Sequence, residues 1–274
     1  MNILVTNDDG VTAPGLLALA QAMRAFGEVK ILAPDHNWSG GGHVKTLDRP
    51  LRVKELRLAG GQIAWASDGA PSDCVALALH GFFEDKFDLV VSGINPMANL
   101  GHDVTYSGTV TAAMEAVIWG VPGIAFSLGS VENDLSISNF TSAASIAQKV
   151  IGAVIQCTVP PGILLNVNVP MLQESQIKGF RTTRLGLRVY HDLLDRREDP
   201  RGLPYYWIGG DIPTGIPENG TDIGALSDGF VSVTPLHLDL TAYTAIPWIT
   251  NWHLNVNTSI TNQLPILNQV LLER

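Results

Sequence analysis

The sequence predicts an α/β protein built on a mainly parallel β-sheet with helices on both faces. Apolar, strand-like runs alternate with helical runs over about the first 170 residues. The strand-like runs are apolar throughout, which is typical of strands that are buried on both faces. At 274 residues the chain exceeds the usual domain size of roughly 100–150 residues. We therefore expect one large domain with an appendage, or two domains.

The first β-α-β unit justifies the parallel sheet. We expect a strand over residues 2–6, a helix over 14–26 and a second strand over 29–33. Pro14 suits the first turn of a helix, because the N–H that proline lacks would be unpaired there, and Gly27 follows the last helical residue. A covering helix between two strands places those strands parallel in one sheet.

The later elements continue the alternation as far as residue 170. After a hairpin-like stretch over 51–66, the expected elements are helix 71–80, strand 87–93, helix 108–120, strand 121–129, helix 138–155 and strand 162–170. The pattern then loosens into shorter polar strands and turns. A short helix and a strand are expected over 221–236, and an amphipathic helix over 262–274. We therefore predict a core over residues 1–172 and an extension over 173–274 with a hairpin and a C-terminal helix.

Composition and charge limit the partners. The formal net charge of −9 argues against a nucleic-acid polymer or an anionic membrane as the main partner. Only 16% of the residues are charged, against about 25% in a typical domain, whereas 46% are hydrophobic. This balance leaves little polar surface for a monomer, so we expect buried contacts between subunits.

The cysteines and the N-terminal residues indicate the compartment. Cys74 and Cys157 are the only cysteines, and both lie in apolar segments, so we expect neither a disulfide framework nor a thiolate metal site. The chain begins with a strand, without the features of a signal peptide, and no stretch approaches the roughly 18 apolar residues of a spanning helix. We expect a soluble cytoplasmic protein.

Two adjacent carboxylates, Asp8 and Asp9, follow the first strand in the sequence NDDG. Their charges repel each other, so solvent or a bound cation must offset the repulsion. The alternative is a polar turn in which one aspartate caps the next helix, which is favoured at roughly two to one for the motif alone.

Polar clusters also follow two other strands. Residues 34–43 include Ser39, and residues 92–103 include Asn95. In an open parallel sheet the loops at the carboxyl ends of neighbouring strands converge. Carboxylate, amide and hydroxyl oxygens are hard ligands of the kind that Mg²⁺, Mn²⁺ or Ca²⁺ prefers. We therefore expect the three loops to surround one such cation.

Ser107, Gly108 and Thr109 stand at the start of the helix expected over 108–120. A helix start presents free backbone N–H groups and the positive end of the helix dipole, which together favour phosphate. The alternative is simple capping by Ser107 or Thr109, the commoner case for an isolated Ser-Gly-Thr. The turn and the carboxylate pair together are more informative than either alone.

These segments together resemble the SurE, or survival protein E, family of nucleotidases. The motifs are NILVTNDDG at the start, APD…SG after the second strand, GAPSDCV over 69–75, VVSGIN…YSGTV.AA.E over 90–115, PPG.LLNVN.P over 160–170 and TD..AL..G.VSVTPL..DLT over 221–241. They are colinear and extend from Asn2 to Thr241, so the resemblance is specific.

The resemblance implies a metal-dependent phosphomonoesterase that acts on nucleoside 5′- and 3′-monophosphates and, in some members, on short polyphosphate. It implies one divalent cation per subunit, Mg²⁺ or Mn²⁺, with Ca²⁺ as an alternative in crystals. It also implies a Rossmann-like three-layer core whose C-terminal extension mediates homodimers or homotetramers. The implied metal ligands are Asp8, Asp9, Ser39 and Asn95. The implied phosphate-binding residues are Asn99, Ser107, Gly108 and Thr109.

The candidate catalytic residues are Asp9 and Ser107. Asp9 is the candidate to orient or deprotonate the attacking water, but a carboxylate bound to metal is a poor free base, so a residue outside the ligand shell is the alternative. His43, His102 and His237 lie in or near the motifs, and for each a structural role is about three times commoner than catalysis.

Some positions depart from the family's usual residues. Trp38 stands where many relatives have a basic residue, Gly41 and Gly42 replace more polar residues, and Met97 stands where glycine is frequent. A lost cation weakens phosphate attraction, whereas an indole can stack on a nucleobase. We therefore expect a specificity that differs from the family norm. The alternative function is a catalytically weak nucleotide-sensing oligomer of the same fold.

Other phosphate-binding classes fit less well. A haloacid dehalogenase phosphatase needs Asp-x-Asp after its first strand, and a receiver domain needs an acceptor aspartate where Asn95 stands. Neither G-x-x-x-x-G-K-[ST] nor G-x-G-x-x-G between a strand and a helix occurs. Binding of a nucleoside triphosphate or a dinucleotide cofactor therefore has little support.

Overall fold

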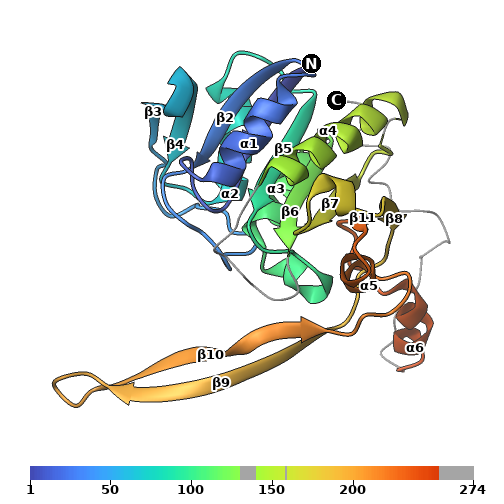
Figure 1. Ribbon diagram of the computed structural model, residues 1–274. Helices are drawn as coiled ribbons and strands as arrows, with labels where there is room; N and C mark the ends of the chain where they lie inside the picture. The colour runs from blue at the N-terminus through green and yellow to red at the C-terminus, as the bar shows by residue number, and fades with distance from the viewer. Residues whose placement is uncertain (130–139, 158, 253–274) are drawn as a thin grey trace.

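The computed structural model of the chain describes residues 1–129, 140–157 and 159–252 (Figure 1). Its centre is a nine-stranded sheet, and a separate two-stranded sheet projects from the core (Figure 1). The strands of the main sheet, in their order across it, are β3 (Val53–Arg57), β4 (Ile63–Ser67), β2 (Glu28–Pro34), β1 (Asn2–Thr6), β5 (Leu89–Asn95), β6 (Gly123–Gly129), β7 (Ile163–Pro170), β11 (Val231–His237) and β8 (Phe180–Thr182). The predicted α/β class with a mainly parallel sheet is confirmed.

The central strands from β4 to β7 run parallel, and antiparallel pairs occur only toward the two edges of the main sheet, among the described residues. β1 lies between β2 and β5 because Ile3 pairs with Val29 on one side and with Leu89 on the other. The loops that follow β1, β2 and β5 therefore leave the sheet at the same edge.

Helices cover both faces of the sheet. α1 (Pro14–Met23) and α4 (Phe140–Cys157) pack on one face, and α2 (Pro71–Leu77) and α3 (Gly108–Ile118) on the other (Figure 1). Successive side chains of a strand point to opposite faces. Accordingly, Ile3 and Val5 join the core under α1 and α4, whereas Leu4 joins the core under α2. This double burial explains the uninterrupted apolar run Ile3–Val5 within β1.

Two predicted helices end earlier than expected. The helix expected over 14–26 ends at Met23, and the one expected over 71–80 ends as an α-helix at Leu77. A π-helical turn over Ala78–Phe82 follows, in which Gly81 adopts a φ of 102° that glycine tolerates. The other short helical turns within the described ranges are η1 (Ala59–Gly61), η3 (Gly101–Thr105), η5 (Glu174–Gln176) and η6 (Tyr243–Ala245).

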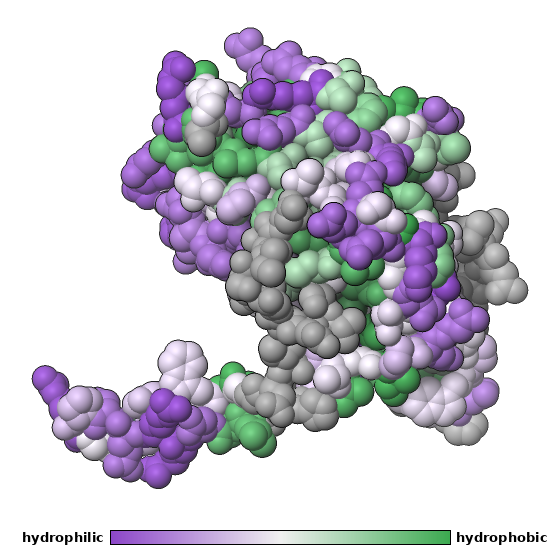
Figure 2. All heavy atoms as spheres, viewed as in Figure 1, coloured by the Kyte–Doolittle hydropathy of each residue, from purple (hydrophilic) through white to green (hydrophobic). Residues whose placement is uncertain are grey.

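The two-stranded sheet is a long hairpin, which we call the arm. It consists of β9 (Arg188–Glu198) and β10 (Pro204–Gly215), which pair antiparallel. Asp199 closes the turn between them, since its side chain accepts the N–H groups of Arg201 and Leu203. These strands are longer than the short polar strands expected there. Figure 2 shows hydrophobic surface on the part of the arm nearer the core and hydrophilic surface toward its tip.

The remaining C-terminal elements return to the core. α5 (Asp222–Ser227) leads into β11, which agrees with the short helix and strand expected over 221–236. α6 (Ile246–Thr250) follows. The division of the chain at residue 172 into a core and an extension stays a prediction. β8 and β11 lie beyond that residue and are strands of the main sheet. The helix expected over 262–274 lies outside the described residues. Within residues 1–129, 140–157 and 159–252, none of the helices has the length and apolar character needed to cross a bilayer.

Candidate metal and phosphate site

Two loops at the edge where β1 and β2 end are hydrogen-bonded to each other. The backbone N–H of Val11 donates to the carbonyl of Pro34 over 2.8 Å, and the N–H of Trp38 donates to the carbonyl of Asp8 over 2.8 Å. The loop that carries Ser39 therefore lies beside the loop that carries the carboxylate pair.

The NDDG turn is held from within by Asn7, whose side chain is fully buried. Asn7 Nδ2 donates to the carbonyl of Gly10 over 3.1 Å, and the N–H of Gly10 donates to Asn7 Oδ1 over 3.2 Å. Gly10 has a φ of 105°, which a residue with a Cβ rarely adopts. Asn7 and Gly10 together fix the turn in which Asp8 and Asp9 lie.

Asp8 is buried against the first turn of α3. Its Oδ1 accepts a hydrogen bond from the hydroxyl of Thr109, and an added Cβ on Gly108 would come within 2.7 Å of the Asp8 Cβ. Burial raises the pKa of Asp8, and the hydrogen bonds from Thr109 and the backbone of Gly108 only partly oppose this. The start of α3 therefore faces a carboxylate.

Asp9 is the least satisfied polar residue of the turn. Its Oδ2 is buried and has no hydrogen-bond partner among the described residues. Burial, followed by the negative charge of Asp8, raises the pKa of Asp9 to about 7. A buried carboxylate oxygen without a partner costs free energy, and a cation would offset that cost. The pair therefore fits a bound cation chemically.

A cation at this pair would need neutral ligands as well. Among the described residues, no group of three or more His, Cys, Asp or Glu side chains could hold a metal ion. Hard divalent cations accept amide and hydroxyl oxygens in addition to carboxylates. Asn95 and Ser39 carry oxygens of these two kinds.

Asn95 and Ser39 lie on the two flanking loops. Asn95 is buried at the end of β5, and its Nδ2 donates to the carbonyl of Met97. Ser39 is exposed, and its backbone N–H donates to Asn37 Oδ1 over 2.6 Å. Among the described residues, no hydrogen bond joins either side chain to Asp8 or Asp9. The structure thus places them on neighbouring loops without a direct bond to the pair.

Ser107 and Thr109 have different contacts at the start of α3. Ser107 caps the helix, since its Oγ accepts the N–H of Val110 over 3.1 Å. Thr109 is fully buried and uses its hydroxyl on Asp8. Ser107 therefore acts as a helix cap, which is the alternative role that the sequence left open for this turn. Thr109 instead joins the start of α3 to Asp8 of the carboxylate pair. We call residues 107–109 the phosphate turn, after the role that the sequence predicts for them.

Asn99 is held by the ends of two strands. Its Nδ2 donates to Ser127 Oγ at 2.8 Å, and its N–H donates to Asn168 Oδ1 at 2.9 Å. The carbonyl of Asn99 accepts from Asn166 Nδ2 and Asn168 Nδ2 at 2.9 and 3.1 Å. Its amide nitrogen is thus already engaged within the protein.

Trp38 and Met97 lie next to two of the predicted ligands, since the Trp38 N–H donates to the carbonyl of Asp8 and the Met97 carbonyl accepts from Asn95. The Trp38 ring lies 5.2 Å from that of His36, centre to centre, and its indole N–H is buried without a partner among the described residues. Met97 is exposed. Trp38 is therefore partly covered by the protein.

Sequence reasoning missed the role of Glu115, which is buried on α3. It accepts hydrogen bonds from His43 Nε2 at 2.8 Å, Lys45 Nζ at 2.9 Å and Trp119 Nε1 at 2.8 Å. Burial alone would raise the pKa of Glu115, but these three groups outweigh it and lower the pKa to about 2. His43 therefore has a structural partner.

Glu115 fastens residues 42–46, which we call the strap, to α3. Thr111, one helical turn before Glu115, donates its hydroxyl to the carbonyl of Gly42 at 3.1 Å. At the other end, Thr46 donates from its N–H and its hydroxyl to Asp73 at 2.9 and 2.6 Å. The strap thereby anchors to the core the segment that follows Ser39 in the chain. A charged residue on the buried face of an otherwise apolar helix was the available signal.

Comparison with known proteins identifies the family. The family model described as Survival protein SurE matches residues 3–192. A protein of Herpetosiphon aurantiacus named 5′-nucleotidase SurE is 49% identical over 262 residues, which cover 96% of this chain and 99% of that protein. The protein of the same name from Chloroflexus aggregans is 46% identical over 252 residues, covering 92% and 99%.

A solved structure agrees with these matches. The crystal structure of the SurE protein from Aquifex aeolicus superposes with a TM-score of 0.78 at 42% sequence identity, covering 91% of this chain and 98% of that one. The family model, the relatives and the shared fold together establish that the chain belongs to the SurE family of survival proteins.

Proposed function

We propose that this protein is a divalent-metal-dependent phosphomonoesterase that hydrolyses nucleoside 5′- and 3′-monophosphates to nucleoside and phosphate, with short-chain polyphosphate as a further substrate. The names of its relatives support nucleotidase activity. The observation that carries the proposal is the buried pair Asp8 and Asp9, in which Asp9 Oδ2 has no partner among the described residues while Thr109 orients Asp8.

One Mg²⁺ or Mn²⁺ per subunit is the cofactor that we propose, with Asp8, Asp9, Ser39 and Asn95 as its ligands. When bound, such a cation would polarise a phosphoryl oxygen and lower the pKa of a water molecule. The contribution of the protein is a pair of carboxylates whose orientation is fixed by Asn7 and Thr109 before any ligand arrives.

The side chains of this chain have separate tasks in the proposal. We assign phosphate binding to the phosphate turn because it lies at the positive end of the α3 dipole, and Ser107 as the cap keeps that turn in shape. Asp9 Oδ2 is the atom that we assign to orient the attacking water or accept its proton. Asn99 is the further phosphate-binding residue that we propose, and the hydrogen bond from its amide nitrogen to Ser127 fixes its side chain.

We also propose that the protein acts as a homodimer or homotetramer in the cytoplasm. The arm supports assembly, because its side chains Leu193, Leu194 and Ile208 are 71%, 67% and 82% exposed. Exposed apolar groups of this size mark interaction surfaces. Cys74 and Cys157 are free thiols, which a reducing compartment preserves.

A phosphate-release panel tests the function. Nucleoside 5′- and 3′-monophosphates and a short polyphosphate are each incubated with Mg²⁺ or Mn²⁺, with and without a chelator. The proposal expects phosphate release that requires the metal.

Trp38, in place of a basic residue, favours a second candidate function, a nucleotide-sensing oligomer with weak catalysis. Nucleotide binding without phosphate release would support that candidate and contradict the first.

A further inference from the structure

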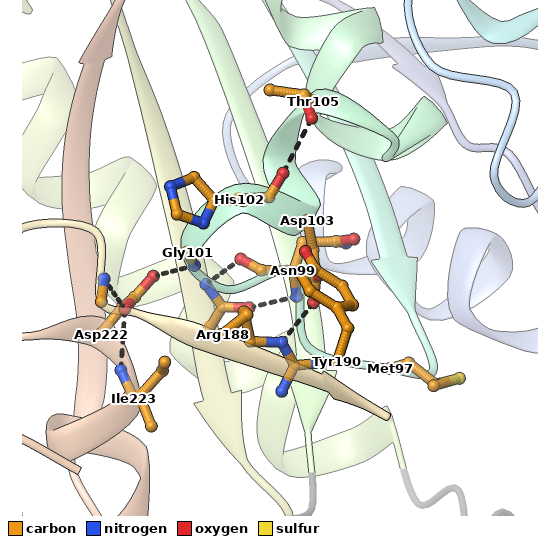
Figure 3. Close-up of polar contacts among 12 residues, drawn as sticks. Met97, Asn99, Gly101, His102, Asp103, Thr105, Arg188, Tyr190, Asp222 and Ile223 are labelled. Carbon is orange, nitrogen blue, oxygen red and sulfur yellow. Dashed lines mark hydrogen bonds and ion pairs between the residues drawn. The ribbon is translucent and has the colours of Figure 1, made fainter. Parts of the chain in front are cut away.

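The phosphate turn is held in place by Asp103, which lies in η3 (Figure 3). The backbone carbonyl of Asp103 accepts the N–H groups of Tyr106 at 2.9 Å and of Ser107 at 3.0 Å. Ser107 is the cap of α3. The position of the Asp103 backbone therefore sets the position of the residue that begins the phosphate turn.

The carboxylate of Asp103 is bound by the first residues of the arm (Figure 3). Arg188 Nε donates to Oδ2 at 2.6 Å, and the Tyr190 hydroxyl donates to Oδ1 at 2.8 Å. The side chains of Arg188 and Asp103 are 13% and 19% exposed, so this ion pair is largely shielded from water. Shielded, hydrogen-bonded pairs constrain geometry more strongly than exposed ones.

Tyr190 remains a donor over the whole neutral range. Partial burial, together with its hydrogen bond to Asp103, raises the pKa of the Tyr190 hydroxyl to about 12. The hydroxyl therefore keeps its proton, and both oxygens of Asp103 have a donor from the arm.

A second contact ties η3 to the chain just before the arm. Asp222 accepts the N–H of Gly101 at 2.8 Å with one oxygen and the N–H of Gly186 at 2.7 Å with the other (Figure 3). An added Cβ on Gly101 would come within 2.5 Å of the Gly186 carbonyl oxygen, so the two segments are in close contact. η3 is thus bound at its start, through Asp222, to the chain just before β9, and at its centre to the first residues of β9.

We propose that Asp103 is a positioning residue that couples the arm to the phosphate site. Asp103 binds Arg188 and Tyr190 and thereby fixes the position of η3. Through η3 it also holds the phosphate turn in the position that phosphate binding requires. This inference rests on the proposed phosphoesterase function. The arm projects from the core and exposes apolar side chains to which a second copy of the chain can bind (Figures 1 and 2). In this proposal such binding affects the position of the phosphate turn through Asp103.

The test removes the donors and leaves Asp103 itself in place. The variants are Tyr190→Phe, Arg188→Met and the two combined, with Arg188→Lys as the conservative replacement. Tyr243→Phe is a matched control because it also deletes a tyrosine-to-aspartate hydrogen bond, the one to Asp239. Arg184→Met deletes an exposed arginine ion pair to Glu218 of 2.7 Å. The measurements are kcat and KM, the inhibition constant of inorganic phosphate, the Mn²⁺ affinity and Tm.

A misplacement of about 1 Å can cost about 100-fold in rate, so a displacement of roughly half that size corresponds to about tenfold. We expect the combined variant to lose about tenfold in kcat/KM and to bind inorganic phosphate correspondingly less tightly, with unchanged Mn²⁺ affinity. Arg188→Lys regains part of the loss, and both controls match the wild type. If the combined variant keeps kcat/KM and phosphate inhibition within about twofold of wild type, the proposal is overturned.

Other outcomes are decisive as well. A combined variant that loses phosphate and Mn²⁺ binding together, with a large fall in Tm, shows a general structural role and also overturns the proposal. If the wild-type protein releases no phosphate from any nucleotide, the proposed function fails. In that case the calorimetric affinity for inorganic phosphate still tests the role of Asp103 independently.

Discussion

Thr109 donates its hydroxyl to Asp8, and this bond joins two residues that are 101 positions apart in the sequence. Both side chains are buried, so the hydrogen bond is shielded from water. It fixes one carboxylate of the pair on the first turn of α3 and leaves the second, Asp9, with an unpaired oxygen. Asp8, a proposed metal ligand, and the phosphate turn are therefore joined by a buried contact.

Replacement of Thr109 by valine is expected to lower kcat/KM about 10- to 100-fold, because a hydrogen bond to a charged group contributes about 1.5–3 kcal/mol. Valine keeps the shape of threonine but removes the donor. Thr109→Ser, which retains the hydroxyl, is the control and should stay close to wild type. Phosphate release from a nucleoside monophosphate measures the effect. Equal activity of the valine and serine variants would show that the hydroxyl has no role.

Gly108→Ala is expected to reduce both activity and stability. The new Cβ would lie 2.7 Å from Asp8 Cβ and 3.1 Å from Pro71 Cγ, so the carboxylate or the helix must shift. Overpacking of this kind costs about 1–3 kcal/mol. Gly152→Ala in α4 is the control, because its Cβ would meet nothing within 4 Å, and alanine favours the helix by up to about 1 kcal/mol. Urea unfolding and phosphate release should separate the two variants, and a Gly108→Ala protein as stable and active as wild type would refute the prediction.

Glu115 should make folding stability depend on pH below 4.5. Its pKa falls from 4.5 to about 2 on folding, so the ionised form stabilises the native state above pH 4.5 and this contribution disappears as the pH falls toward 2. The full contribution is about 3 kcal/mol. Free energies of unfolding for wild type and Glu115→Gln should therefore differ most near neutral pH and converge in acid.

Glu174→Gln provides the control for this measurement, because Glu174 makes an ion pair of 2.7 Å with Lys149 at an exposed position. Exposed pairs contribute little, so this variant should behave like wild type at every pH. A difference between wild type and Glu115→Gln that stays constant from pH 7 to pH 3 would argue that His43 and Lys45 do not depend on the charge of Glu115.

Local patterns predicted the centre of the fold. The strand over Asn2–Thr6 was predicted at its observed bounds, because Ile3–Val5 form the uninterrupted apolar run that is typical of a strand buried on both faces. The start of α3 was predicted because Ser107 has the side chain of a helix cap. The length of the arm was not predicted, since Leu193 and Leu194 are exposed neighbours and give no alternation of buried and exposed positions.

Contacts between distant residues were beyond sequence reasoning for a physical reason. The bond from His43 to Glu115 joins residues 72 apart, and that from Arg188 to Asp103 joins residues 85 apart. No periodicity or local motif encodes such a pair, because it exists only once the sheet has brought the loops together. Asp8 and Asp9 could be singled out, in contrast, because adjacent carboxylates carry a local electrostatic cost.

The central claim is that Asp8 and Asp9 hold a divalent cation, and calorimetric titration with Mn²⁺ tests it most directly. The variant is Asp8→Asn combined with Asp9→Asn. Its control is Glu84→Gln combined with Asp85→Asn, an adjacent acidic pair that is exposed to solvent. We predict that wild type and control bind one Mn²⁺ per subunit and that the asparagine variant binds it about 100-fold more weakly or not at all. Undiminished Mn²⁺ affinity in the Asp8→Asn, Asp9→Asn protein would contradict the account.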